Sequence, residues 1–132
     1  LAELESAHPS AAGWGLSGFK AEFKQPSALV LAVQEHGTLC GFICARILAP
    51  EAQVLNMAVR SSCQRRGVAT LLLSELFKRA RAQGCSMATL EVRKSNASAI
   101  ACYERAGFKI VGSRPKFYNG TEDAVLMDAF LS

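Results

Sequence analysis

The spacing of hydrophobic residues changes along the chain and divides it into strands and helices. Apolar residues run almost continuously through Ala28–Val33 and Leu39–Leu48, with the turn residues Glu35–Gly37 between them. Short apolar runs bounded by turn residues are typical of buried strands, so these segments predict a hairpin. A polar loop is predicted at Arg114–Gly120. The remaining predicted strands are Gln53–Val59, Met87–Val92, Phe108–Val111 and Ala124–Phe130.

Apolar residues three and four positions apart predict two long helices. The first runs from about Gly67 to Gln83, and Gly84 ends it as a left-handed glycine does. Its apolar face is formed by Val68, Leu71, Leu72, Leu76 and Ala80. The second runs from about Ala97 to Ala106, with Ser95-Asn96 supplying its N-cap and Gly107 stopping it.

Two further helices are expected near the start of the chain, at Leu1–Ala7 and Leu16–Phe23. The chain of 132 residues is long enough for one domain, spanning 1–132, with a substantial core. The order is a hairpin, then β-α-β-α-β, then a last strand. It predicts an α/β domain with three layers around one mixed, mostly antiparallel sheet flanked by helices.

Composition narrows the class of protein. Half of the residues are hydrophobic and a fifth are charged, as in ordinary globular domains. No apolar run reaches the roughly 18 residues of a membrane span. The acidic start, Leu1–Glu5, lacks the basic region of a signal peptide, so a cytoplasmic protein is expected. The net charge of +4 suits an anionic ligand without requiring nucleic acid.

The cysteines indicate reduced thiols and not a disulfide framework or a metal site. They are odd in number and lack paired spacing, and only His8 and His36 could join them as nitrogen ligands. A zinc site is therefore not predicted. The five cysteines are Cys40, Cys44, Cys63, Cys85 and Cys102.

The basic segment Gln64–Thr70 joins a strand to the first long helix. Arg65 and Arg66 lie where the helix dipole is positive, which costs roughly 0.3–1 kcal/mol for each cation. A bound anion would reverse this sign, because helix N–H groups and guanidinium groups would converge on it. The segment is therefore either a solvated basic turn or a phosphate site. It is not a P-loop, because the Gly-Lys-Ser/Thr ending is absent.

Three polar residues further along each have two interpretations. Glu91 alternates with Leu90 and Val92, so it faces the other side of its strand, where it is either a base or an exposed carboxylate paired with Arg93 or Lys94. Tyr103 is either functional or packed in the core. Asn96 is either functional or only a helix cap.

Taken together, these segments resemble the GCN5-related N-acetyltransferases (GNAT superfamily). Leu90–Phe108 resembles the closing motif of that family, and Gln64–Ala69 matches its Q/R-x-x-G-x-G/A signature with alanine in the last place. The RimI-type branch, whose members acetylate the N-terminal alanine of a ribosomal protein, is the most similar, and Glu122–Met127 resembles its tail. The resemblance runs from about Trp14 to Met127. The family opens with a strand that is not visible ahead of Leu1, so the first strand is expected to be absent.

The resemblance implies that acetyl-coenzyme A is the co-substrate and that no metal is needed. Asn96 would hydrogen-bond its pantetheine arm, Glu91 would be the general base, and Tyr103 would be the general acid. A backbone N–H of Met57 or Ala58 would stabilise the thioester oxygen. The other implied cofactor-binding residues are Val59, Arg65, Arg66, Gly67, Val68, Ala69 and Thr70.

The implied acceptor is the α-amine of a protein, and a ribosomal protein that begins with alanine is expected. An α-amine has a pKa roughly 2.5 units below that of lysine, so deprotonation at neutral pH costs about 3.4 kcal/mol less. The partner is then a protein and neither nucleic acid nor a membrane. One alternative is a GNAT enzyme that acetylates lysine or a small-molecule amine.

A second alternative belongs to another class, a non-catalytic basic module that binds the ribosome or nucleic acid. Aromatic residues are not interleaved with its basic residues, which counts against it, and Glu91 would have no role. The basic residues concerned are Arg60, Arg65, Arg66, Lys78, Arg79 and Arg81.

Overall fold

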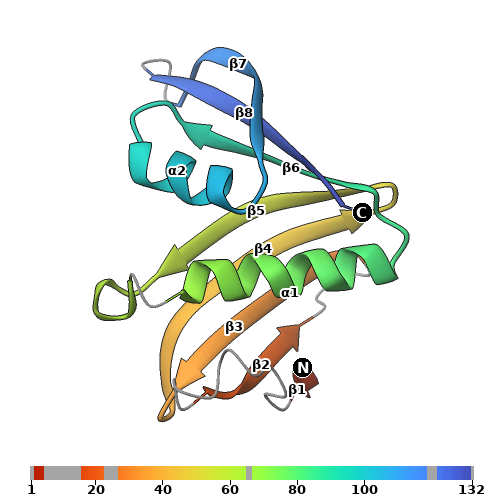
Figure 1. The fold of residues 1–132 in the computed structure, drawn as a ribbon, viewed down its shortest axis with the longest axis vertical. Coiled ribbons are helices and arrows are strands. Elements are labelled where there is room, and N and C mark those ends of the chain that lie inside the picture. Colours follow the sequence, from red (N-terminus) through yellow and green to blue (C-terminus); the bar gives the residue numbers. More distant parts are fainter. Residues whose placement is uncertain (1, 5–15, 23–26, 65–66, 119–121, 132) are drawn as a thin grey trace.

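The computed structural model describes residues 2–4, 16–22, 27–64, 67–118 and 122–131, which form one eight-stranded sheet and two α-helices (Figure 1). The order across the sheet is β1-β2-β3-β4-β5-β6-β8-β7, and β5–β6 is the parallel pair among otherwise antiparallel neighbours. The strands are β1 Ala2–Leu4, β2 Leu16–Glu22, β3 Ala28–Glu35, β4 Thr38–Leu48, β5 Glu51–Val59, β6 Met87–Arg93, β7 Lys109–Tyr118 and β8 Glu122–Phe130. The helices are η2 Ser61–Cys63, a 3-10 turn, α1 Val68–Ala82 and α2 Ala97–Arg105.

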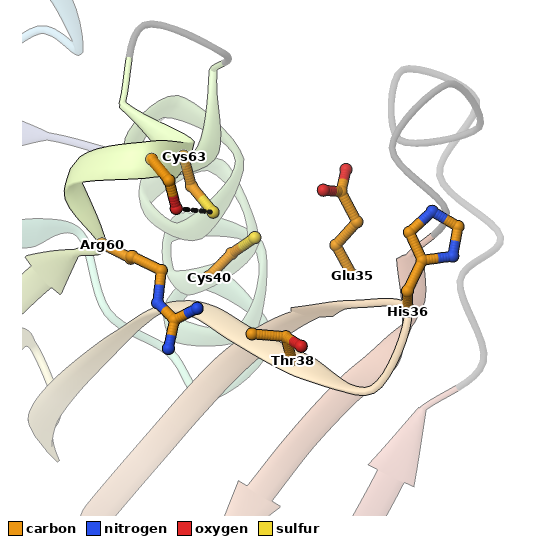
Figure 2. A pocket seen from close by; sticks show the side chains of 7 residues that line it. Glu35, His36, Thr38, Cys40, Arg60 and Cys63 are labelled. Atoms are coloured by element: carbon orange, nitrogen blue, oxygen red, sulfur yellow. Dashed lines mark hydrogen bonds between the residues drawn. The ribbon is translucent and has the colours of Figure 1, made fainter.

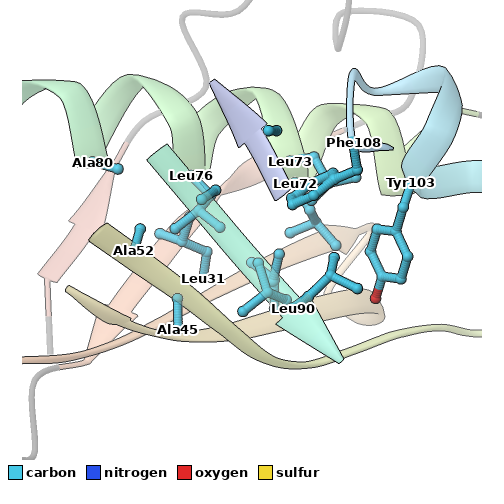
Figure 3. Packing of buried hydrophobic residues seen from close by; sticks show 14 of the residues in the cluster. Leu31, Ala45, Ala52, Leu72, Leu73, Leu76, Ala80, Leu90, Tyr103 and Phe108 are labelled. Atoms are coloured by element: carbon cyan, nitrogen blue, oxygen red, sulfur yellow. The ribbon is translucent and has the colours of Figure 1, made fainter. Parts of the chain in front are cut away.

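Both α-helices lie on one face of the sheet. Helix α1 packs across β3, β4 and β5 (Figure 1), and the rings of Phe77 in α1 and Phe108 lie 5.7 Å apart. Phe108 in turn meets the ring of Tyr103 in α2 at 5.6 Å. Leu72 and Leu76 of α1 are fully buried between the helix and the strands (Figure 3). The core therefore lies between these helices and the sheet, and it fixes both helices relative to β5 and β6.

The sheet splits between β5 and β6 next to a β-bulge in β5. The two strands pair only as far as Val54 and Leu90. On its other side, β5 pairs Val54 with Ala45 and Asn56 with Cys44, so Leu55 is an extra residue. An extra residue of this kind bends its strand and disrupts the ladder. Beyond the bulge β5 therefore no longer follows β6, and the two strands separate.

The bulge also changes which side chains of β5 face the helices. Ala52 and Val54 are buried under the helices before it. After it, Met57 stands opposite Ile43, which is fully buried. Directly opposite residues share a face, so Met57 and then Val59 point to the helix side.

The α/β class and the mixed, mostly antiparallel sheet are confirmed, but both helices expected near the chain start are wrong. Residues of Leu1–Ala7 and Leu16–Phe23 instead supply β1 and β2, which pair with each other and, through β2, with β3. Without β2, the outer edge of β3 would leave backbone N–H and C=O groups without partners, and pairing them outweighs a weak local preference for helix. The described sheet thus opens with strands where none was expected, and residues 1, 5–7 and 23 of the two expected helices lie outside the description.

The loop predicted at Arg114–Gly120 is also wrong in part, because β7 continues to Tyr118. Pairing with β8 extends this strand, and β7 is the edge of the sheet, where Pro115 is tolerated. The other predicted strands and both long helices are confirmed within a few residues. Gly84 has φ 89°, as predicted for a helix-ending glycine.

None of the five cysteines, all of which lie in the described ranges, forms a disulfide; Cys40, Cys63 and Cys85 are buried, and Cys44 and Cys102 are half-buried. Of the described helices, neither α1 nor α2 combines the length and apolarity needed to cross a bilayer.

Candidate functional site

A pocket of about 530 Å³ opens where β5 leaves β6, between the start of α1 and one face of α2. The size suits a small organic ligand or cofactor. Every predicted cofactor-binding residue that the structure describes lines it, whereas Arg65 and Arg66 lie outside the described residues. These lining residues are Met57, Ala58, Val59, Gly67, Val68, Ala69, Thr70 and Asn96.

The start of α1 forms one wall of the pocket and has two features that favour an anion. Gly67 adopts a left-handed conformation with φ 81°, and its carbonyl accepts the first helical hydrogen bond from Leu71 N at 2.9 Å. Within the described part of the chain, no side chain caps this helix start and its first turn holds no acidic residue. The N–H groups of Val68, Ala69 and Thr70 precede the first helical donor, so they can receive a phosphate at the positive end of the dipole.

The wall formed by β5 is packed closely against β4. A Cβ placed on Gly41 would lie 2.9 Å from the carbonyl oxygen of Ala58 and 3.0 Å from Cγ1 of Val68. Both contacts belong to residues that line the pocket. Glycine at this position therefore lets β4 approach β5 and the helix start together.

The opposite wall comes from one face of α2. Asn96 caps the helix by accepting a hydrogen bond from Ala99 N at 3.2 Å, and its Oδ1 also accepts one from Ser98 Oγ at 3.3 Å. The cap interpretation is thus confirmed, and the same residue lines the pocket. The Asn96 side chain can cap the helix and also bind a ligand, because Oδ1 accepts the capping hydrogen bond while the amide nitrogen can donate to a group in the pocket.

Several lining residues were missed in the sequence. Ser98, Cys102 and Arg105 are spaced by four and three residues, so they share the face of α2 that turns toward the pocket. That spacing was the signal that could have found them. Burial raises the pKa of the Cys102 thiol, and the nearby positive charge of Arg105 lowers it by a smaller amount. Cys63, just before the basic segment, and Gln64, its first residue, were also missed.

Glu91 does not line the pocket; it lies on the sheet face opposite the helices, where the split begins. Leu90 and Val92 are buried toward the helices, which confirms the predicted facing of Glu91. Its side chain is 24% exposed, and its Oε1 lies 3.0 Å from Nη2 of Arg114 in β7. Arg93, one of the two expected partners, instead pairs with Glu122. Since β5–β6 pairing ends at Leu90, Glu91 is the first residue of β6 beside the gap.

Tyr103 is a buried residue of α2, with its ring edge-on to Phe108. Its side chain points from α2 toward the strands, with the hydroxyl at the far end (Figure 3). Packing in the core therefore explains the position of the Tyr103 ring, and the hydroxyl lies at the end of the side chain nearest the strands. Like Glu91, Tyr103 is not a lining residue of the pocket.

A second pocket, of about 320 Å³, lies at the turn between β3 and β4 (Figure 2). Cys40 and Cys63 lie on one side of it, and Glu35 and His36 on the other. Within the described ranges, no three His, Cys, Asp or Glu side chains are placed to hold a metal ion. None of the predicted site residues lines this pocket.

Comparison with known proteins gives the family. Residues 2–108 match the family model described as the acetyltransferase (GNAT) family. The ribosomal protein bS18-alanine N-acetyltransferase of Escherichia coli strain K12 is 36% identical over 96 residues, which are 70% of this chain and 65% of that protein. The corresponding enzyme of Salmonella typhimurium is 38% identical over 92 residues, 67% of this chain and 62% of that protein. The matched region is thus less than two thirds of the length of these relatives.

The fold agrees with these matches. The crystal structure of the ribosomal-protein-S18-alanine N-acetyltransferase from Escherichia coli superposes with a TM-score of 0.75 at 30% identity, covering 99% of this chain and 92% of that chain. The predicted resemblance is confirmed, and the chain belongs to the acetyltransferase (GNAT) family.

Proposed function

We propose that this protein transfers the acetyl group of acetyl-coenzyme A to the N-terminal α-amine of a protein. The observation that carries the proposal is the end of β5–β6 pairing at Val54 and Leu90: the pocket with the start of α1 opens on the helix side of this split, and Glu91 follows Leu90 on the opposite face. The proposed acceptor is a ribosomal protein that begins with alanine. Support for this choice comes from the relatives, whose names specify ribosomal protein bS18-alanine.

The residues of the pocket fit coenzyme A. The uncapped start of α1 suits the pyrophosphate, because its N–H groups and the helix dipole both favour negative charge. The backbone of Met57–Val59 beyond the bulge is free of β6 and can pair with the peptide-like pantetheine arm. Asn96 approaches that arm from α2. The cofactor supplies an activated acetyl group as a thioester.

Two side chains of this chain would move protons. Glu91, on the opposite face, would accept a proton from the acceptor amine as the amine approaches through the split, directly or through water. Tyr103 would donate a proton to the departing thiolate from the helix side. A backbone N–H of Met57 or Ala58 would stabilise the charge that develops on the thioester oxygen. An α-amine, with a pKa of about 7.7–8.0, loses its proton more easily than a lysine side chain, so it depends less on a strong general base.

The acceptor is tested with peptides and mass spectrometry. Wild-type protein is incubated with acetyl-coenzyme A and peptides that begin with Ala, Ser or Met and carry an internal lysine. The Ala-initiated peptide should be acetylated at its α-amine, and blocking that amine should leave the lysine largely unmodified. Acetyl groups found mainly on lysine would move the activity to the lysine alternative. If no peptide is acetylated, the proposed transfer to these acceptors is wrong.

The base and acid are tested by substitutions that keep shape. Glu91→Gln should reduce turnover at neutral pH, and the loss should shrink as pH rises and free amine becomes abundant. Tyr103→Phe should lower turnover on the order of 10²-fold while binding of acetyl-coenzyme A stays close to wild type. Glu104→Gln, an exposed carboxylate of α2, is the matched control and should behave as wild type. A Glu91→Gln variant with the wild-type pH profile would leave Glu91 structural.

A further inference from the structure

The start of β8 holds the corner between β6 and α2. Glu122 Oε2 accepts a hydrogen bond from Ser95 N at 2.9 Å, and its Oε1 lies 3.2 Å from Nη1 of Arg93. The adjacent backbone adds a third tie, because Lys94 N donates to the carbonyl of Asp123 at 3.1 Å. Each residue from Arg93 to Ser95 is thus bonded to Glu122 or Asp123. The corner cannot shift unless these bonds break.

The residue that follows this corner is Asn96, which lines the cofactor pocket. Asn96 N donates to the carbonyl of Arg93 at 2.9 Å, so its backbone is bonded to the residue that Glu122 pairs with. On the other side its Oδ1 accepts from Ala99 N. The direction of the Asn96 side chain is therefore set by two things, the first turn of α2 and the corner held by Glu122.

The charge of Glu122 suits a positional role better than a stabilising one. Arg93 is 48% exposed and Glu122 24% exposed, and ion pairs at such exposure add little to global stability. Hydrogen bonds from the side chain and the backbone of Ser95 hold the pKa of Glu122 below its ordinary value. The carboxylate is charged throughout the neutral range, and the interactions that need its charge weaken only when pH falls through the lowered pKa.

We propose that Glu122 is a positioning residue that aims Asn96 into the pocket and thereby sets the affinity for acetyl-coenzyme A. The inference rests on the proposed function, in which Asn96 contacts the pantetheine arm. It also gives a purpose to the Glu122–Met127 segment, whose first residue is remote from the pocket lining and from Glu91 in the sequence. Glu122 touches neither substrate and takes no part in proton transfer.

The test separates cofactor binding from turnover. Glu122→Ala should raise KM for acetyl-coenzyme A on the order of tenfold, within the roughly 100-fold loss that misplacing a group by 1 Å can cause. The value of kcat should stay within about twofold of wild type, because the groups proposed to move protons are unchanged. Glu122→Gln keeps an oxygen for Ser95 N and should lie between wild type and Glu122→Ala. Glu104→Gln removes the same charge from an exposed site on α2 and should leave KM unchanged.

A double-mutant cycle shows whether the effect passes through Asn96. Asn96→Ala should raise KM by itself, and adding Glu122→Ala to it should raise KM little further. Independent, multiplying effects on KM would overturn the proposal, as would a wild-type KM in Glu122→Ala. If Asn96→Ala keeps a wild-type KM, the proposed contact of Asn96 with the cofactor fails, and the positioning role fails with it. If only Glu122→Ala keeps a wild-type KM, the proposed function stands and the Glu122 assignment alone is wrong.

Discussion

Gly41 of β4 lies against Ala58, Val59 and Val68, three residues that line the pocket, so Gly41→Ala tests the geometry of the site directly. The added Cβ would stand 2.9 Å from the Ala58 carbonyl oxygen, 3.0 Å from Val68 Cγ1 and 3.3 Å from Val59 Cγ2. Real Cβ atoms do not approach other heavy atoms within 3.0 Å, and the closest of these contacts is backbone. Either β5 or the first residue of α1 must therefore move.

The size of the effect follows from this overpacking. Forcing extra atoms into a packed interior costs about 1–3 kcal/mol in the free energy of unfolding. With an unfolding entropy of roughly 2.1 cal/mol/K per residue, a chain of 132 residues would lose about 4–11 °C in Tm. The residues that must move line the pocket, so the Tm increase caused by acetyl-coenzyme A should also shrink. For the wild type, cofactor at 100 times its Kd should stabilise by about 2.7 kcal/mol.

Gly112→Ala is the matched control, because a Cβ there would meet only Cδ1 of Leu126, at an ordinary 3.6 Å. Replacing glycine by alanine without strain stabilises a protein by about 0.4–1 kcal/mol through the unfolded chain. In thermal scans Gly41→Ala should therefore lower Tm relative to wild type and Gly112→Ala should raise it. The increase in Tm on adding acetyl-coenzyme A should be smaller than in wild type only for Gly41→Ala. Equal Tm values and equal cofactor responses would refute the close approach of β4 to the pocket wall.

Two further predictions concern the α2 wall of the pocket. Among the described lining residues Arg105 is the one with a full charge. Arg105→Gln should weaken the binding of coenzyme A, measured by calorimetry, more than the binding of its analogue without the 3′-phosphate. Lys78→Gln, which removes an exposed charge from α1, should weaken the binding of neither ligand. Burial raises the pKa of Cys102, so alkylation of this thiol should be slow at neutral pH and accelerate as pH rises, and coenzyme A should protect it. Cys85, a buried thiol outside the pocket, should show no protection in mass-spectrometric mapping, and equal protection of both thiols would contradict the assigned pocket.

The parts of the fold that the sequence predicts well are those that local chemistry decides. The helix from Val68 to Ala82 has a continuous apolar face and ends at a glycine with φ 89°. Asn96 is a cap by residue type and by geometry. Alternation alone places Glu91 on the face away from the helices, as the burial of its neighbours confirms. In each case the decisive interactions lie within about four residues.

The parts that the sequence does not predict depend on partners distant in the chain. Strand β2 is decided by pairing with β3 and β1, and β7 extends past Pro115 because β8 is beside it. The ion pair between Glu91 and Arg114 crosses β8, which no local pattern indicates. Nor does any residue type mark Leu55 as a bulge, since the mismatch exists only in the register against β4.

That single extra residue links the two halves of the proposed chemistry. Without the bulge, β5 would stay paired with β6. Met57, which now points to the helix side beside Ile43, would then point to the opposite face of the sheet. The pocket on the helix side and Glu91 on the other side would then be separated by a continuous ladder of hydrogen bonds. With it, the ladder ends at Val54 and Leu90, one residue before Glu91. A cofactor held under the helices and an amine arriving from the opposite face can then meet without displacing one another, which favours direct transfer between them.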